Sequence, residues 1–478
     1  MSPFTMTLMQ PRTWPRSCLL ALTCGLVACL LAACSGGGNT LVSGGVGSGG
    51  SGTAEGAVTG FGSVIVTGVE YDDTNAKVVV DTAQGQPEAT EVKLGQRVRI
   101  RHSKAGVADT IQVLPQLRGT ASSAQDAQGV FTLLGQTVQI VSTSDTQNTA
   151  TVLEGLTTVA SGDDLEVHGN WVFNSTRGYS VLIATRIEKL STPADPVLVS
   201  GVVHTRNNDV LTLDDGTGQT LQYAHLPANL ASQSLVTAWV QRSALATSPW
   251  IATRVVDASP TLTDSEHLLL NTQVSERDLA QGEIRVQGLR VKLTSAFSSA
   301  PLNVGSTIQI EIVRDGEGYK TVALAQRQSG NDLGGLVELK GSLSWPGNSV
   351  QLSLRGNLVN VSEGVLATNC AGLKTNDKVY LEITAQRTSP GQPLRATQVS
   401  CSLQIPTNSV IEVSGTLTQF STTAQTMTMR TIQGVVLNLV WNSTTLQPLN
   451  LADLLNRSVE IEYQTVNGEN RLRKVKPN

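Results

Sequence analysis

Few residues in this sequence have the types and spacing that enzymes or metal sites use. The histidines are scattered, and none forms an H-x-H or H-E-x-x-H pair that would hold zinc: His102, His168, His204, His225 and His267. His102 and His168 lie at matched strand ends, which we interpret as surface positions. No nucleophile elbow, phosphate-binding loop or dinucleotide fingerprint occurs. We expect no catalytic residue, no metal and no cofactor.

Three pairs of adjacent aspartates could supply oxygen ligands to calcium: Asp72-Asp73, Asp163-Asp164 and Asp214-Asp215. Each pair lies next to or near Gly or Asn, in a sequence context typical of turns. Asp side chains in such positions commonly bond to the backbone of their own turn. We therefore favour turn formation over calcium binding.

The amino terminus has the pattern of an export signal. Arg12 and Arg16 precede an apolar run, 18–32, that is shorter than the roughly 20 residues needed to span a bilayer. The run ends Leu-Ala-Ala-Cys at 31–34, which resembles the lipobox of bacterial lipoproteins. This resemblance implies cleavage after residue 33 and lipidation of Cys34. The alternatives are an ordinary signal peptide and a weaker lipobox ending at Cys29.

The segment after Cys34 fits a tether. Residues 35–52 contain nine glycines in eighteen positions, so this segment would behave as a flexible coil. Ser35, rather than Asp, follows the cysteine, and by resemblance to lipoprotein sorting in Gram-negative bacteria this favours the outer membrane. We expect a lipid-anchored protein of the cell envelope on its periplasmic or surface face.

Two cysteines, Cys370 and Cys401, remain in the expected mature chain besides Cys34. An exported protein meets conditions that permit disulfides, so we favour a Cys370–Cys401 disulfide that adds stability. The alternative is two separate buried thiols. Two cysteines alone cannot complete a zinc site.

Composition favours an all-β protein and argues against nucleic acid as a partner. Charged residues make up 15% of the chain and aromatic residues 4%, and there are 44 glycines. Soluble domains usually carry about 25% charged residues. Abundant Thr, Val and Ser with many glycines is typical of short strands joined by turns. The clustered Lys and Arg that nucleic-acid binding requires are missing.

A turn followed by alternating apolar residues recurs six times, as in Gly95-Gln96-Arg97-Val98-Arg99-Ile100. The copies start at Gly95, Gly162, Ser232, Gly305, Asn376 and Asn456. Gly and Asn tolerate positive φ best, so the pattern predicts a tight turn that leads directly into a half-buried strand. The steps between copies are 67, 70, 73, 71 and 80 residues, which indicates whole small domains.

About five short strands in each repeat favour a tandem array of about six small barrel-like domains, OB-like or SH3-like. A row of β-sandwiches is the alternative, although each sandwich usually needs about 100 residues. The expected division is 1–33 signal peptide, 34–54 tether, and β units 1 to 6 at 55–117, 118–192, 197–258, 264–328, 334–403 and 409–478.

Residues 56–69 (GAVTGFGSVIVTGV) with 94–98 (LGQRV) resemble the opening of domain-of-unknown-function family 5666. That family occurs in tandem in proteobacterial lipoproteins behind a Gly-rich tether. The resemblance is clearest over residues 55–115, and the Phe-Gly-Ser element is missing from the later units. It implies envelope-anchored β repeats and supplies no activity and no catalytic residues.

These features predict a membrane-anchored, non-enzymatic envelope lipoprotein that acts as a binding, spacer or structural array of β domains. Its expected partners are the membrane, through the lipid on Cys34, and an envelope protein or polysaccharide. The alternative is a carbohydrate-binding lipoprotein that stacks sugars on exposed tryptophans. Trp171, Trp239, Trp250 and Trp345 fit this alternative by type, although small barrels more often bury tryptophan.

Overall fold

In the residues that the computed structural model describes, nearly all of the regular secondary structure is β-strand. The described residues are 52–477 without 67–68, 104–105, 143–149, 261, 263–265, 279, 317, 327–335, 346–350, 363–365, 367–369, 371–372, 375–376, 388–391, 403–410, 432–435, 442–450 and 467–468. Within these residues the helices are a 3-10 turn at Arg242–Ala246 and the short α2 at Leu451–Leu454. The predicted all-β fold class is confirmed.

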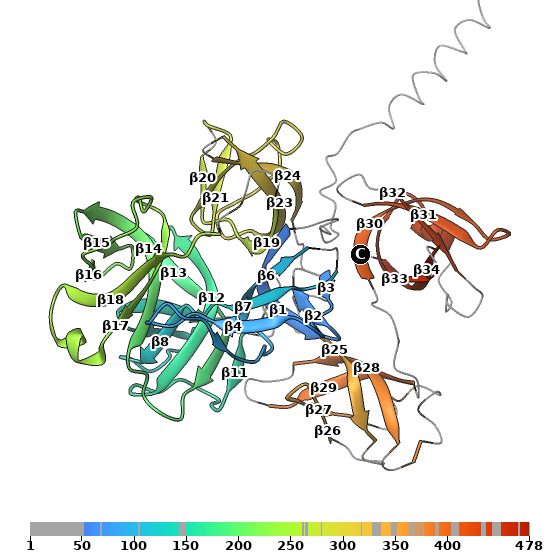
Figure 1. Ribbon diagram of the computed structural model, residues 1–478, viewed down its shortest axis with the longest axis horizontal. Helices are drawn as coiled ribbons and strands as arrows, with labels where there is room; N and C mark the ends of the chain where they lie inside the picture. The colour runs from blue at the N-terminus through green and yellow to red at the C-terminus, as the bar shows by residue number, and fades with distance from the viewer. Residues whose placement is uncertain are drawn as a thin grey trace, which may run out of the picture. The chain divides into compact units, whose positions relative to one another are not determined.

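Unit 6 closes into a barrel (Figure 1). Its strands are β30 (Ile411–Ser421), β31 (Thr426–Thr431), β32 (Val436–Val440), β33 (Ser458–Val466) and β34 (Glu469–Pro477). They pair in the order β30-β31-β32-β34-β33 and back to β30. β32 and β34 run parallel, and the other neighbours run antiparallel. A five-stranded barrel in this order, with a helical turn before its fourth strand, has the OB-type arrangement.

Unit 3 closes a ring of pairings in the same order. Its strands are β14 (Val197–Asn207), β15 (Val210–Leu213), β16 (Thr220–Gln222), β17 (Leu235–Val240) and β18 (Trp250–Asp257). β14 pairs with both β15 and β17, and the parallel pair is β16 with β18. The first strand of the unit therefore lies between the second and the fourth.

The other units repeat the key pairings. Unit 1 contains β1 (Gly52–Phe61), β2 (Val64–Val66), β3 (Val69–Tyr71), β4 (Lys77–Val80), β5 (Glu88–Ala89), β6 (Arg97–His102) and β7 (Thr110–Val113). Unit 2 contains β8 (Leu117–Thr120), β9 (Val130–Leu133), β10 (Gln136–Ile140), β11 (Val152–Glu154), β12 (Asp164–Asn174) and β13 (Tyr179–Lys189). The parallel pair of unit 1 is β4 with β7, and in unit 2 both β10 and β11 run parallel to β13.

Units 4 and 5 follow the same rule. Unit 4 contains β19 (His267–Gln273), β20 (Glu276–Asp278), β21 (Glu283–Val286), β22 (Leu289–Lys292), β23 (Thr307–Asp315) and β24 (Gly318–Gln326). Unit 5 contains β25 (Leu336–Ser344), β26 (Gln351–Leu354), β27 (Asn357–Asn360), β28 (Lys378–Gln386) and β29 (Leu394–Ser402). Their parallel pairs are β22 with β24 and β27 with β29.

The recurring turn has one backbone geometry in the five units where it is described. Its first residue has a φ between 61° and 91° in Gly95, Gly162, Gln233, Gly305 and Asn456. The N–H of that residue donates to a carbonyl in or just after the first strand, at 2.6–2.9 Å: Val58, Ala121, Val203, Val274 and Leu417. The same partner returns a bond, because its N–H donates to the carbonyl of the next turn residue. The turn is thus fastened to the first strand before the fourth strand begins.

The third copy starts one residue later than the sequence predicted. Gln233, not Ser232, has the positive φ of 70° and donates to Val203. The reason is the next position, where the Ser234 hydroxyl accepts from the Ala231 N–H at 3.1 Å. Gln96, Asp163, Ser306 and Asp377 accept in the same way in units 1, 2, 4 and 5. In units 1 to 5 a polar acceptor after the turn residue is therefore part of the motif, whereas unit 6 makes the same turn with Arg457 at that position.

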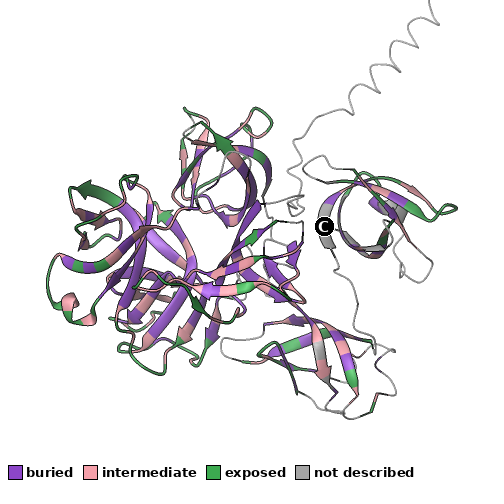
Figure 2. Ribbon diagram, viewed as in Figure 1, coloured by how far each residue is buried: buried purple, intermediate pink, exposed green. Residues whose placement is uncertain are grey.

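The hydrophobic cores follow the strands (Figure 2). One cluster joins residues of units 1, 4 and 5, a second joins units 2 and 3, and a third lies wholly within unit 6. Strands also pair between units. β1 lies parallel to β19 over Gly52–Glu55 and parallel to β25 at Gly60 and Phe61, while β8 pairs with β14. The expected boundary between units 1 and 2 falls inside β8, which pairs with β12.

We predict that Gly305→Ala lowers the free energy of unfolding by about 1 kcal/mol. Its φ is 85° and no atom lies within 4 Å of the place that the added methyl group would take, so backbone strain alone is tested. Calorimetric unfolding measures the change. Gly318→Ala is the matched control in the same unit, because Gly318 lacks a positive φ and has an equally open surrounding. Equal stability of the two variants would contradict the role of the turn.

Candidate functional site: the buried charged contacts of unit 1

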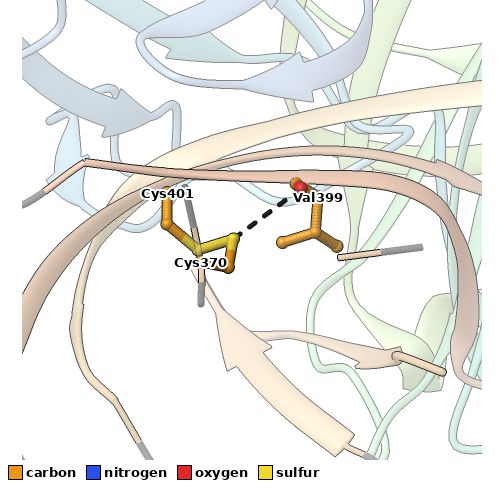
Figure 3. The surroundings of a disulfide bond; sticks show 3 residues. All are labelled: Cys370, Val399 and Cys401. Carbon is orange, nitrogen blue, oxygen red and sulfur yellow. Dashed lines mark hydrogen bonds between the residues drawn. A yellow bond between two sulfur atoms is a disulfide. The ribbon is translucent and has the colours of Figure 1, made fainter. Parts of the chain in front are cut away.

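The two cysteines of unit 5 form a disulfide (Figure 3). Cys401 lies in β29, and Cys370 precedes β28. Both residues are buried, and the Cys370 Sγ lies 3.8 Å from the carbonyl oxygen of Val399. The bond therefore fastens the connection before β28 to the last strand of the unit. Cys34, the expected lipidation site, lies outside the described residues.

The interpretation of His102 and His168 as surface positions is wrong. They are only 3% and 0% exposed, respectively. The His102 ring packs 5.4 Å from the Tyr71 ring. His168 is covered by unit 1, because the backbone nitrogen of Arg97 lies 3.4 Å from its Nδ1. That contact joins residues 71 apart in sequence, so local pattern could not show it.

The paired aspartates make turn and ion-pair contacts. Asp72 accepts from the N–H of Thr74, and Asp215 accepts from the N–H groups of Thr217 and Gly218. Asp163 accepts from the N–H of Ala160. The turn interpretation is confirmed for these residues. Throughout the described part of the chain, no group of three or more His, Cys, Asp or Glu is arranged to hold a metal ion.

The four tryptophans considered for sugar stacking are buried: Trp171, Trp239, Trp250 and Trp345. Trp171 donates its indole N–H to Gln116 and Ser200 in the core between units 2 and 3. Arg254 lies over the ring of Trp239 at 4.7 Å. Their ring faces therefore serve packing, as the core interpretation predicted.

The structure instead brings charged residues together at Glu55. Glu55 lies on β1 in register with Arg99 on β6, and Arg97 is two residues away on the same face. The Nη2 of Arg97 donates to one carboxylate oxygen, and the Nε of Arg99 donates to the other at 2.7 Å. Glu55 and Arg97 are each 2% exposed. Burial alone would raise the pKa of Glu55, but Arg99 and Arg97 hold it below its usual value.

This ion pair extends into three other units. The Nη1 of Arg97 donates to the Oδ1 of Asn170 in unit 2. The side-chain amide of Gln287 in unit 4 donates to the same oxygen at 3.1 Å. The Nη2 of Arg99 donates to the carbonyl of Ala258, the last residue of unit 3, at 3.0 Å. We call Glu55, Arg97, Arg99, Asn170 and Gln287 the Glu55 cluster.

A second charged group lies next to it on unit 2. Glu166 accepts from the Nε of Arg118 at 2.8 Å and lies 2.9 Å from the Nε2 of His168. Because the Arg97 N–H faces Nδ1, the proton of a neutral His168 belongs on Nε2, where it donates to Glu166. Burial raises the pKa of Glu166, but His168 and Arg118 outweigh it and lower the pKa to about 2.

The recurring turn of unit 1 is itself docked on unit 2. The Nη1 of Arg186 donates to the Leu94 carbonyl at 2.9 Å, and the Thr185 hydroxyl donates to the Gly95 carbonyl at 2.7 Å. Lys93 pairs with Glu188 at 2.6 Å. A Cβ on Gly95 would lie 2.7 Å from the Thr185 carbonyl, so glycine is required by this contact as well as by its φ.

Unit 5 contacts unit 1 at the Phe-Gly-Ser element. The Nζ of Lys340 lies 3.1 Å from the Oε2 of Glu70, and both side chains are buried. A Cβ on Gly62 would lie within 3 Å of both side chains. Arg355 pairs with Asp73 at 2.8 Å and lies over the Phe61 ring at 5.8 Å. The element therefore marks the place where unit 5 packs on unit 1, which explains why the sequence shows it in the first unit.

These clusters hold neighbouring units together through ion pairs and hydrogen bonds. Their carboxylates are paired with guanidinium, ammonium or imidazole groups, and such charges are costly to bury unless they are paired. One sequence signal could have indicated them: Arg97, Arg99 and Arg101 alternate along a strand whose partner strand carries Glu55. Charges at alternate strand positions in a chain with few charges point to an interface.

No known family model matches the chain, and no curated protein matches it. None of the helices in the described residues is long and apolar enough to cross a membrane.

We predict that Arg97→Met lowers the free energy of unfolding by about 3–5 kcal/mol, because Glu55 then stays buried without its partner. Urea unfolding followed by tryptophan fluorescence measures the loss. The double variant Glu55→Leu/Arg97→Met should regain most of the loss, since no charge is left unpaired. Arg290→Met, which removes an exposed pair with Glu283, is the control and should change stability by less than about 1 kcal/mol. A double variant with a lower free energy of unfolding than Arg97→Met would argue against the stabilising role of the Glu55–Arg97 pair.

We predict that the junction of units 1 and 2 weakens in acid. Glu55, Glu166 and Glu188 all have lowered pKa values in the folded chain. Their stabilisation is complete above the usual carboxyl pKa and is lost as the pH falls from about 4.5 toward 2. Glu166 alone accounts for about 3 kcal/mol. Urea midpoints between pH 7 and 3 should fall more steeply in the wild type than in Glu166→Gln, and parallel curves would exclude Glu166 as a source.

Proposed function

We propose that the chain is a non-enzymatic lipoprotein of the bacterial cell envelope, anchored through Cys34, whose β units form a binding or structural body. The proposal also assigns the chain to the tandem-repeat lipoproteins of domain-of-unknown-function family 5666. The partners are the membrane, through the lipid, and a component of the envelope.

The use of the charged residues is the observation that supports this proposal. Glu55, Glu70, Glu166 and Glu188, the acidic residues of the clusters, are each committed to a cation within the folded chain. Side chains that an enzyme would keep available for substrate are here used to fasten one unit to another. The result is a body whose units share buried ion pairs and whose sequence carries few charges, which suits a scaffold or a spacer.

Carbohydrate binding is the less favoured alternative. Sugar sites usually offer an exposed aromatic face, whereas Trp171, Trp239, Trp250 and Trp345 are buried. Among the described tryptophans, Trp441 of unit 6 is half-buried and is the position to test. Binding of the full chain to a defined glycan on a polysaccharide array, abolished by Trp441→Ala, would favour this alternative over a scaffold.

We predict that a palmitate analogue fed to cells that express the full chain labels the wild type and does not label Cys34→Ala. The thioether at the lipobox cysteine is the first acylation step, so loss of its sulfur removes the anchor. Labelling is measured on the purified chain. After membrane fractionation, we expect Cys34→Ala in the soluble fraction and the wild type in the membrane fraction.

The matched control is Cys29→Ala, which alters the weaker lipobox and should keep both the label and the membrane fraction. Label retained in Cys34→Ala, or lost in Cys29→Ala, would overturn the assignment of the anchor to Cys34.

A further inference from the structure

Among the described residues, one buried cation differs from the others in having no carboxylate partner. Arg387 follows β28 in unit 5 and is 8% exposed. Its Nη1 donates to the carbonyl of Ala150 in unit 2, a residue that is itself buried. Among the described residues, its Nε is buried with no hydrogen-bond partner.

The other buried cations of the described chain are each neutralised. Arg97 pairs with Glu55, Arg186 with Glu188 and Lys340 with Glu70. No ion pair involves Arg387 among the residues that the structure describes. A buried cation without its counter-charge costs several kcal/mol in an ordinary fold.

The surroundings of Arg387 increase this imbalance. Burial lowers the pKa of Arg387, and the nearby Arg186 lowers it further, to about 10, so the group stays cationic at neutral pH. Around Arg186, Lys93 is the other cation, and Glu154 and Glu188 are the carboxylates. With Arg387 included, three cations face two carboxylates among the described residues, which leaves one positive charge there.

The guanidinium geometry defines what would neutralise it. Nη1 donates to Ala150, whereas Nε has no hydrogen-bond partner among the described residues. In a guanidinium group the Nε–H lies parallel to one N–H of Nη2, on the edge away from Nη1. Two parallel donors match two oxygens of one anion, as in bidentate pairs of arginine with carboxylate or phosphate. We propose that Arg387 binds a small oxyanion, a phosphate or a carboxylate, at the contact between units 2 and 5.

Equilibrium dialysis of the full chain against radiolabelled inorganic phosphate tests the proposal. We expect saturable binding of one phosphate per chain in the wild type and loss of that binding in Arg387→Met. The melting temperature of the wild type should rise by about 1–3 °C for each tenfold increase in phosphate above the dissociation constant, at constant ionic strength. Acetate in place of phosphate distinguishes a carboxylate site, and chloride measures the effect of charge alone.

Arg395→Met is the matched control, since Arg395 is an exposed arginine on β29 that contacts Gln386 at 3.0 Å. It should bind phosphate like the wild type. Arg387→Lys, which keeps the charge without the fork, covers the case in which Arg387→Met does not fold, and should bind at least tenfold more weakly. Wild-type chain that binds neither anion in a saturable manner, or Arg387→Met that binds as the wild type does, would overturn the proposal.

Discussion

The pairing of Glu55 with Arg97 is the interaction on which the contacts between units depend. A carboxylate and a guanidinium that are both 2% exposed lose nearly all their hydration, so each needs the other and further hydrogen bonds to complete its shell. Arg97 obtains them from Asn170 of unit 2, and that amide oxygen also holds Gln287 of unit 4. The position of one ion pair in unit 1 thereby fixes which surfaces of two other units face it.

The recurring turn places that ion pair. A residue with positive φ is held to the first strand by two backbone hydrogen bonds, and the fourth strand starts immediately afterwards. In unit 1 this brings Arg97 opposite β1, two residues after Gly95. The same turn in other units carries different residues at that position, such as Asp164 in unit 2 and Thr307 in unit 4. The same turn thus supports different contacts in different units. The backbone fixes where the residue two positions after the turn lies, and its side chain determines what it contacts.

Much of the fold could be read from local sequence. The turn residues Gly95, Gly162, Gly305 and Asn456 were predicted from residue type, because positive φ is a local property. The third turn was misplaced at Ser232 because Gln233 is not a residue type that favours positive φ. The structure shows that the Ser234 hydroxyl, which accepts a hydrogen bond from Ala231, identifies the turn. The charged clusters were missed since they join residues 42 to 270 positions apart. The prediction that His168 lies at the surface was wrong for the same reason, because sequence periodicity within one unit does not encode a contact with another unit.

The Phe-Gly-Ser element of unit 1 has a consequence for how the chain is made. Its partners on β25, and the Lys340 that meets Glu70, lie about 270 residues further along. Until synthesis reaches them, this surface of unit 1 faces water. An apolar docking surface would invite aggregation during that interval, whereas carboxylates remain well hydrated. The surface of unit 1 that unit 5 later covers is partly apolar, but its carboxylates, Glu70 and Asp73, keep part of that surface hydrated until unit 5 has been made.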